Sequence, residues 1–313
     1  METAAVVMTG PKSLGVESVR IRPPATGESV VETLYSGISS GTEKLFWSGE
    51  MPPFPGMGYP LIPGYESVGE VVESESQSGL KTGDLVFIPG SNCFEGIKGL
   101  FGGASRHIST SSNRLIKVNS GLAQNATLFA LAATARHAIA GFSSSLPDLI
   151  VGHGVLGRLL ARLTIAAGGK PPTVWEISND RFDGSEGYRV IKPDEDTKAD
   201  YGTIYEASGD AKLIDTLIGR MRKGGELVLT GFYAQSINFA FAQAFMKEMR
   251  MRVSAEFNAD DICATRALID TGSLSLDGLI SHMEPASNAN RSYERAFNDN
   301  GCLKMILDWR NMQ

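Results

Sequence analysis

The chain has 313 residues, with 29 Lys and Arg against 35 Asp and Glu and a formal net charge of −6. Its 42% hydrophobic and 20% charged residues are ordinary for a globular protein of one or two domains, which excludes a disordered or fibrous chain. The negative charge argues against nucleic-acid binding. The sequence contains no apolar run of about 18 residues, which is the length that would predict a membrane span. The three cysteines are too few and too scattered for a disulfide framework or a four-cysteine zinc site. No secretory signal follows Met1, so we expect a cytoplasmic protein.

The first 120 residues predict an antiparallel, β-rich domain. Short runs of alternating apolar and polar residues are separated by glycine and proline, which is typical of strands joined by turns. The expected strands cover residues 29–34, 67–73, 84–88 and 114–118.

The following residues alternate between strand and helix patterns, which predicts a doubly wound parallel sheet. A helix over 124–141 leads in, and further helices are expected at 159–167 and 212–221. Strands are expected at 148–151, around Trp175, and at 188–191, 203–207, 226–232 and 251–257. The last segment predicts a helix after residue 260, a strand at 279–282, a helix at 291–298 and an edge strand at 303–309. We therefore assign 1–120 and 258–313 to one domain and 121–257 to a second.

A glycine-rich segment at 152–157 follows an apolar run and opens a helical pattern, which is the context of a dinucleotide fingerprint. Glu176 stands 19 positions past Gly157, where a carboxylate would bind the adenosine ribose and repel a 2′-phosphate. NAD is therefore favoured, although Arg181 could accommodate the extra phosphate of NADP. Candidate cofactor-binding residues are Gly152, His153, Gly154, Val155, Leu156, Gly157, Glu176 and Ser208. We expect the His153 side chain near the phosphates, and Arg158 either on the pyrophosphate or exposed.

The order of these features resembles the medium-chain dehydrogenase/reductase superfamily. The resemblance runs through residues 36–43, 63–69, 79–86 and 102–104, in the order expected for that superfamily. It implies a GroES-like catalytic domain, a Rossmann domain and a nicotinamide-dependent enzyme. It also implies that 251–257 could pair across a two-fold axis in a homodimer.

The positions that carry zinc ligands in zinc-bearing members of the superfamily hold other residues here. Ser40 stands at the cysteine position, Tyr65 at the histidine position and Ala130, before His137, at the third position. A serine, a tyrosine and an alanine do not supply the ligands of a catalytic zinc, and the lobe of four cysteines is missing too. We therefore expect no metal.

Longer strings at 41–49, 52–66, 89–94 and 99–104 resemble a narrower family, the dehydrogenases that oxidise hydroxyethyl bacteriochlorophyllides in bacteriochlorophyll a biosynthesis of photosynthetic bacteria. This resemblance implies that a hydroxyethyl substituent of a bacteriochlorin becomes an acetyl group, with a nicotinamide cofactor as hydride acceptor. A flat macrocycle binds mainly through apolar and aromatic contacts, which suit an aromatic segment interrupted by proline and glycine. Candidate substrate contacts are Phe46, Trp47, Phe54, Met57 and Tyr59, with His107 as a ligand of the pigment's magnesium. The alternative is that these aromatic residues belong to the β-domain core.

Without zinc, the proton of the alcohol must leave through a side chain or water. Tyr65 is the candidate base, with Ser40 and Thr42 as relay or hydrogen-bonding groups. Lys44 or Glu66 could adjust the acidity of Tyr65. Glu66 and Thr42 could instead brace their turns, and Glu43 and Lys44 could be solvated charges.

Two other functions stay open at this point. One is a zinc-independent quinone or enoyl reductase that uses NADPH, against which Glu176 argues. The other is a non-catalytic protein that binds a dinucleotide or a pigment. Fold alone cannot separate them.

Overall fold

The computed structural model describes residues 1–53, 56–75, 77–140 and 145–312. The chain divides into two compact units, Met1–Ala130 with Ile280–Gln313, and Leu131–Leu279. This division differs from the predicted one over residues 121–130 and 258–279. Helix α6 (Ala259–Asp270) belongs to the second unit, where Asp261 binds Arg136 (2.5 Å) and His137 (2.7 Å) of that same unit. None of the helices in the described ranges is long and apolar enough to cross a membrane.

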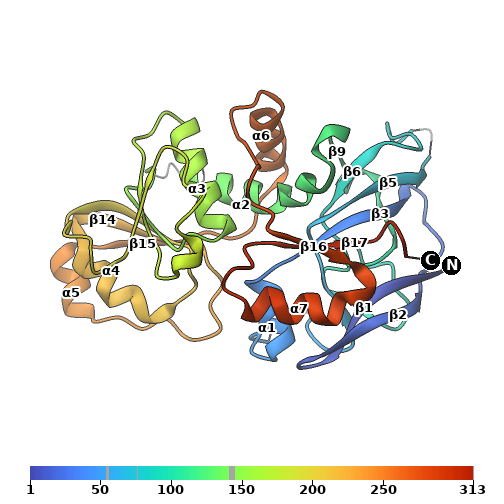
Figure 1. Ribbon diagram of the computed structural model, residues 1–313, viewed down its shortest axis with the longest axis horizontal. Helices are drawn as coiled ribbons and strands as arrows, with labels where there is room; N and C mark the ends of the chain where they lie inside the picture. The colour runs from blue at the N-terminus through green and yellow to red at the C-terminus, as the bar shows by residue number, and fades with distance from the viewer. Residues whose placement is uncertain (54–55, 76, 141–144, 313) are drawn as a thin grey trace. The chain divides into compact units, whose positions relative to one another are not determined.

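The first unit contains two β-sheets (Figure 1). The larger has the strand order β16-β17-β3-β5-β6-β9, and β8 also pairs with β3. Its strands are β3 (Glu28–Ile38), β5 (Ser67–Glu73), β6 (Leu85–Ile88), β8 (His107–Ser111), β9 (Ile116–Lys117), β16 (His282–Pro285) and β17 (Met305–Asp308). The smaller has the order β2-β1-β4-β7, with β1 (Glu2–Gly10), β2 (Ser13–Arg20), β4 (Leu61–Ile62) and β7 (Lys98–Gly99). The four predicted strands of this region correspond to β3, β5, β6 and β9, so the β-rich prediction is confirmed.

The C-terminal segment returns to the first unit, as predicted, but its last strand does not lie at an edge. Strand β17 lies between β3 and β16, antiparallel to β3 and parallel to β16, so the edge strand is β16. The prediction of an edge strand at 303–309 is therefore wrong. Met305, Ile306 and Leu307 are all buried, which is the pattern of an inner strand covered on both faces.

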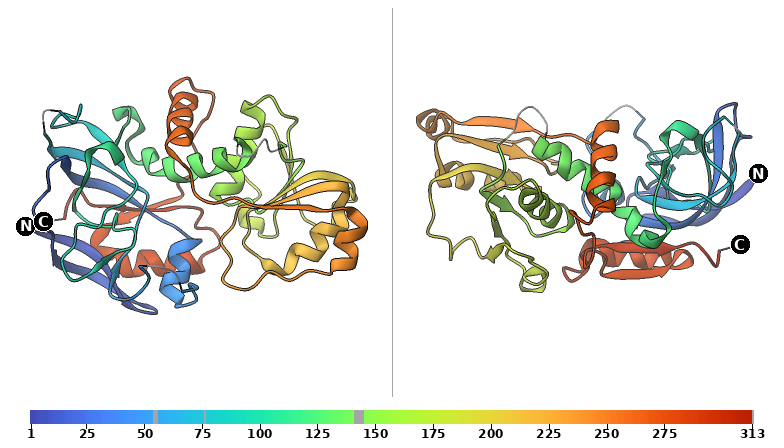
Figure 2. Two further views of the ribbon diagram at one scale, coloured as in Figure 1. Left: turned by 180° about the vertical axis from the view of Figure 1, so that it is seen from behind. Right: turned by 90° about the horizontal axis from the view of Figure 1, so that it is seen from above.

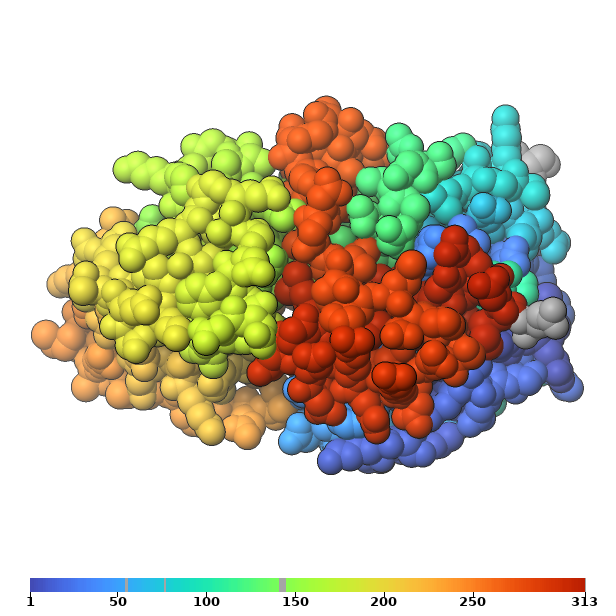
Figure 3. Space-filling model, viewed as in Figure 1, coloured from blue at the N-terminus to red at the C-terminus, as the bar shows by residue number. Residues whose placement is uncertain are grey.

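Two helices of the first unit, α1 (Thr42–Ser48) and α7 (Ala289–Asn298), lie side by side (Figure 2). Helix α7 buries Ala289, Tyr293, Ala296 and Phe297, whose spacing places them on one helical face. Phe297 contacts Trp47 of α1, with 5.4 Å between ring centroids. Figure 3 shows the outer side of α7 on the surface, next to the blue N-terminal strands. The two termini lie at the same end of this unit (Figures 1 and 2).

The second unit is built on a parallel sheet with the strand order β12-β11-β10-β13-β14-β15. Its strands are β10 (Leu149–Val151), β11 (Thr173–Trp175), β12 (Arg189–Ile191), β13 (Tyr201–Glu206), β14 (Met221–Leu229) and β15 (Arg250–Val253). Its other helices are α2 (Phe129–Ala140), α3 (Val155–Ala166), α4 (Ile214–Arg220) and α5 (Phe241–Lys247). Figure 1 shows α2 and α3 on one side of the sheet and α4 and α5 on the other. This order is that of a Rossmann domain, and the topology reverses between β10 and β13, where such sheets bind ligands. The α/β prediction is confirmed.

Candidate active site

The glycine-rich turn lies at the carboxyl end of β10 and has the geometry of a dinucleotide site. Gly152 adopts φ +99°, a region that side chains disfavour, and a Cβ on Gly157 would lie 1.9 Å from the carbonyl oxygen of Gly152. The space beside Gly154 is open, because the nearest atom to a Cβ there would be Nη1 of Arg181 at 3.9 Å. The residues therefore fit a pyrophosphate at the N-terminus of α3, where backbone N–H groups attract anions.

Glu176, directly after β11, is held at this turn by backbone hydrogen bonds. Its Oε2 accepts from the N–H of His153 (3.0 Å), and its Oε1 accepts from the N–H groups of Ile177 (2.7 Å) and Ser178 (2.8 Å). The carboxylate is thus fixed beside the fingerprint, and its role as a ribose ligand stays a prediction. Ile177, which sequence reasoning missed, is 80% exposed beside it.

His153 and Arg158 do not face the open side of the turn. The His153 ring is fully buried, with Nδ1 donating to the carbonyl of Arg181 (2.6 Å) and Nε2 accepting from the Tyr188 hydroxyl (2.8 Å). Burial lowers the pKa of His153 to about 4, so the ring is neutral at pH 7. Arg158 is buried as well and donates to the carbonyls of His153 (3.2 Å) and Arg181 (3.3 Å). The expected placement of both side chains is therefore wrong, and only the backbone of His153 remains near the phosphate site.

The other fingerprint candidates occupy different surroundings. Val155 is buried and Leu156 is half-buried on α3. Ser208 is exposed after β13, and its backbone N–H (2.7 Å) and hydroxyl both donate to Oε1 of Glu206. Burial raises the pKa of Glu206, and the Tyr233 hydroxyl donates to its other oxygen. Since β13 pairs with β10, this buried carboxylate lies next to the turn, and the sequence pattern did not single it out.

In the first unit, Tyr65 lies in the connection between β4 and β5. Its hydroxyl and the Ser39 hydroxyl are hydrogen-bonded at 2.6 Å, and its ring meets the edge of Phe101 with 5.1 Å between centroids. Burial raises the pKa of Tyr65, and Glu66 and Glu43 raise it further, while Ser39 and Thr42 oppose the rise through their hydroxyls. The environment therefore disfavours a phenolate at neutral pH, so Tyr65 can pass a proton but not store a negative charge.

Glu66 is fully buried and pairs with a lysine that sequence reasoning missed. Nζ of Lys304 lies 2.5 Å from Oε2 of Glu66 and also donates to the carbonyl of Ile38 (3.1 Å). The carboxylate covers Gly37 of β3, where a Cβ would lie 2.4 Å from Oε2. The sequence signal for this ion pair was Lys304 itself, a charged residue directly before the apolar run that forms β17, because a lysine is rarely buried without a partner.

Glu43 is a second buried carboxyl in the same unit and is not a solvated charge. It lies in the first turn of α1 with no exposed surface. Burial raises its pKa to about 8, the Tyr293 hydroxyl lowers it, and the neighbouring Glu66 raises it. The Tyr293 hydroxyl and the backbone N–H of Ser39 face this carboxyl and favour its charged form. The cluster of Ser39, Glu43, Tyr65, Glu66, Tyr293 and Lys304 is called the buried polar cluster below.

Two other predicted catalytic residues lie apart from this cluster. Ser40 is exposed, and its neighbour Ser39 is the serine that binds Tyr65. Lys44 is exposed and donates to the carbonyl of Phe297 (2.9 Å) near the end of α7, where a cation complements the helix dipole. Lys44 therefore has a structural partner away from Tyr65. Thr42 begins α1 and interacts with Tyr65.

The predicted aromatic substrate contacts divide between core and surface. Phe46 and Trp47 lie on α1, exposed by 0% and 9%, so they belong to the core and not to a loop. Met57 and Tyr59 are half-buried against the same core, and the Tyr59 hydroxyl donates to the carbonyl of Phe46. Phe54 lies outside the described residues.

His107 is not brought to the buried polar cluster. It pairs with Glu32 of β3, whereas the carbonyl of Glu66 binds the N–H of Gly37, five residues further along that strand. At about 3.3 Å per residue the separation is about 17 Å. Nδ1 of His107 lies 3.3 Å from the Thr3 hydroxyl, and burial lowers the pKa of the ring.

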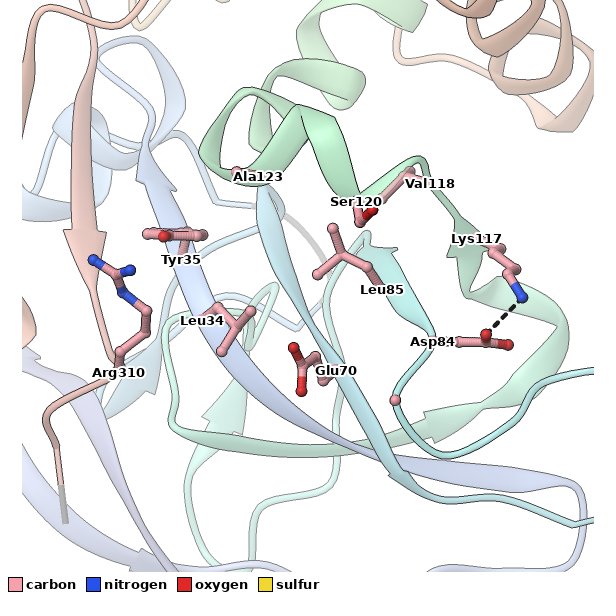
Figure 4. Close-up of a pocket in the computed structure, with 11 residues that line it drawn as sticks. Leu34, Tyr35, Glu70, Asp84, Leu85, Lys117, Val118, Ser120, Ala123 and Arg310 are labelled. Carbon is pink, nitrogen blue, oxygen red and sulfur yellow. Dashed lines mark hydrogen bonds and ion pairs between the residues drawn. The ribbon is translucent and has the colours of Figure 1, made fainter.

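A surface pocket of the first unit shares no residue with the cluster (Figure 4). Its wall includes the ion pair of Asp84 with Lys117 (2.5 Å), and Arg310 lies over the Tyr35 ring at 5.0 Å. Nothing in its lining carries the predicted chemistry. Across the described ranges, no group of three or more His, Cys, Asp or Glu side chains is arranged to hold a metal ion. The absence of a metal from the mechanism stays a prediction.

Comparisons with known proteins give the family. Residues 25–120 match the alcohol dehydrogenase GroES-like domain. The chain is 58% identical to 2-desacetyl-2-hydroxyethyl bacteriochlorophyllide A dehydrogenase of Rhodobacter capsulatus and 56% identical to the protein of that name from Cereibacter sphaeroides, each over 99% of both chains. The structure of acetophenone reductase from Geotrichum candidum, in complex with NAD, superimposes with a TM-score of 0.83 at 17% identity over 98% of this chain and 97% of that one, which shows the fold. The chain therefore belongs to the 2-desacetyl-2-hydroxyethyl bacteriochlorophyllide A dehydrogenase family, within the medium-chain dehydrogenase/reductase superfamily.

Proposed function

We propose that the protein oxidises the hydroxyethyl substituent of a bacteriochlorophyllide a to an acetyl group, as a step of bacteriochlorophyll a biosynthesis. The observation that carries this proposal is the identity of 58% and 56% to two dehydrogenases named for that substrate, over almost the whole chain. The fold adds a dinucleotide turn in one unit and a buried polar cluster in the other. Neither a reductase of activated double bonds nor a non-catalytic binding protein has comparable support.

We propose NAD as the cofactor. When bound, NAD accepts a hydride from the carbon that carries the substrate hydroxyl. The fixed carboxylate of Glu176 has remaining lone pairs for the two ribose hydroxyls and repels a 2′-phosphate. Ile177 offers an exposed apolar face beside that carboxylate for the adenine ring. Gly152, Gly154 and Gly157 let the pyrophosphate approach the start of α3, with Ser208 exposed beside the turn.

We propose that proton transfer proceeds without zinc and begins at Tyr65. Its hydroxyl accepts the proton of the substrate alcohol and passes its own proton to the Ser39 hydroxyl, which in turn releases its hydroxyl proton to a further acceptor such as water, so that no phenolate accumulates. Thr42 supports this hydroxyl network, and the ion pair of Glu66 with Lys304 fixes the turn that carries Tyr65. Supporting contacts of this kind hold a reacting group in position.

We propose that the macrocycle contacts the half-buried side chains of Met57 and Tyr59. Phe46 and Trp47 support these two side chains from the core against which they pack. The carbonyl of Phe46 also accepts a hydrogen bond from the Tyr59 hydroxyl, which holds Tyr59 in place. Phe54 and His107 remain candidate contacts without a structural argument in their favour.

We propose a homodimer formed through the edge of the second unit's sheet. Strand β15 is an edge strand, and Val253 on it is 69% exposed. Helix α5, which leads into β15, exposes Phe241 (72%), Phe245 (65%) and Met246 (72%). Exposed apolar side chains beside an unpaired strand edge are typical of a protein interface. Light scattering of Val253→Lys and Phe245→Glu variants should give half the mass of the parent protein, and an unchanged mass would exclude this interface.

An assay with purified protein tests the function. Incubation with hydroxyethyl bacteriochlorophyllide a and NAD should give the acetyl pigment and NADH in equal amounts, with far slower turnover on NADP. Conversion of quinones or enones with NADPH instead would identify a reductase. Binding of NAD or pigment without turnover would identify a non-catalytic protein.

A further inference from the structure

The connection from β11 to β12 carries the proposed contacts to the adenosine half of NAD. Glu176 and Ile177 lie at its start, directly after β11. Residues 176–188 are all described, and they form no α-helix, only a 3-10 turn (Asn179–Arg181) with no buried residue. In a parallel sheet such a crossover is usually a helix packed on the sheet. Other contacts must therefore hold this connection against the cofactor turn.

The connection folds around the side chain of His153. The ring has no exposed surface, and Nδ1 lies 2.6 Å from the carbonyl of Arg181. Nε2 lies 2.8 Å from the hydroxyl of Tyr188, directly before β12, and the two rings meet edge to face with 5.6 Å between centroids. A carbonyl only accepts hydrogen bonds, so Nδ1 carries the proton and Nε2 accepts from Tyr188. One side chain thus binds both the outgoing and the returning part of the connection.

The backbone of His153 binds the start of the same connection. Its N–H donates to Oε2 of Glu176 (3.0 Å), so the segment 176–181 is bound to His153 at both ends. Arg158 of α3 adds hydrogen bonds to the carbonyls of His153 (3.2 Å) and Arg181 (3.3 Å). Nη1 of Arg181 is the atom nearest to the open space beside Gly154. The segment is therefore fixed with its cofactor-facing groups beside the fingerprint turn.

We propose that His153 is a positioning residue for the adenosine half of the dinucleotide. It acts through the carbonyl of Arg181 and holds the segment 176–181 so that Glu176 and Ile177 are in place before the cofactor binds. The ring is fully buried and does not itself touch NAD. This inference rests on the proposed function, which supplies NAD as the ligand. A segment that is ordered in advance reduces the entropy lost on binding, which strengthens affinity.

Calorimetric titration with ADP-ribose, which contains the adenosine half and the pyrophosphate but no nicotinamide, tests this role. His153→Leu removes both ring nitrogens and should weaken ADP-ribose binding about tenfold. His153→Asn keeps an amide donor close to the position of Nδ1 and should stay within about threefold of the parent protein. His282→Leu, at a half-buried histidine of β16 in the other unit, is the matched control and should bind like the parent.

Steady-state kinetics separate positioning from general damage to the fold. His153→Leu should raise the KM for NAD about tenfold and leave kcat and the KM for the pigment unchanged. A parent protein that binds ADP-ribose without turnover would refute the proposed function, and the binding comparison would still decide the role of His153. Parental affinity in His153→Leu, or equal losses in the leucine and asparagine variants, would overturn that role.

Nitrogen NMR of the imidazole tests the hydrogen bond in the parent protein, even where His153→Leu does not fold. Burial lowers the pKa of His153 to about 4, and the Arg181 carbonyl accepts from Nδ1, so we expect a neutral ring with its proton on Nδ1 between about pH 6 and 8. A His153 ring that is charged in this range, or that carries its proton on Nε2, would overturn the proposal.

Discussion

Replacing Lys304 by methionine removes the cation of a buried ion pair and leaves Glu66 unpaired. The two side chains are exposed by 3% and 0%, with 2.5 Å between Nζ and Oε2. At an effective dielectric constant of about 20, the attraction is about 7 kcal/mol, and the desolvation of both ions offsets much of it. Removal of one partner from such a pair costs about 3–5 kcal/mol, and Oε1 of Glu66 already lacks a partner among the described residues.

Urea denaturation at pH 7 of the parent protein, Lys304→Met, Glu66→Gln and the double variant measures this cost. We expect each single variant to lose about 3–5 kcal/mol of unfolding free energy and the double variant to lose much less than their sum. Additive losses would show that the two side chains do not interact, and a single variant as stable as the parent would refute the burial of the pair.

The remaining predictions concern the cofactor turn and Glu43. Gly157→Ala places a Cβ 1.9 Å from the carbonyl of Gly152, so we expect fluorescence titration to show NADH binding weakened at least about tenfold, and unchanged affinity would contradict the geometry of the turn. Glu176→Ala should weaken NADH binding and narrow its advantage over NADPH, and a constant ratio of the two dissociation constants would remove Glu176 from cofactor selection. Because the folded-state pKa of Glu43 is raised, its burial costs stability as pH rises from about 4.5 to 8, by about 1.4 kcal/mol for each pH unit. Glu43→Gln should therefore melt like the parent below pH 4 and at a higher temperature at pH 9, and a lower melting temperature at pH 9 would argue against an ionisable Glu43 in the core.

The elements with strong local signals could be predicted from the sequence. The fingerprint is recognisable because Gly152 and Gly157 meet steric demands that only glycine satisfies. The parallel strands are recognisable because apolar runs alternate with helical patterns. The predicted edge position of residues 303–309 is wrong, because strand order depends on pairing with β3, which lies far away in the sequence.

The side-chain environments could not be predicted, because they depend on contacts between distant segments. Glu43 and Lys44 are adjacent, yet one is fully buried and the other exposed, since α1 turns one face to the core. Tyr293 and Lys304 reach the cluster from a segment more than 200 residues after Tyr65. The prolines that follow Phe46 and Trp47 favour a loop in the sequence, but α1 ends before those prolines, at Ser48, and Gly49 caps it.

Hydride transfer itself is tested most directly with substrate that carries deuterium on the carbon of the hydroxyethyl alcohol. Mass spectrometry of the nicotinamide product after one turnover should show one deuterium in NADH for each acetyl group formed. Acetyl product with no deuterium in the nicotinamide, or no acetyl product in the presence of NAD, would contradict the proposed function.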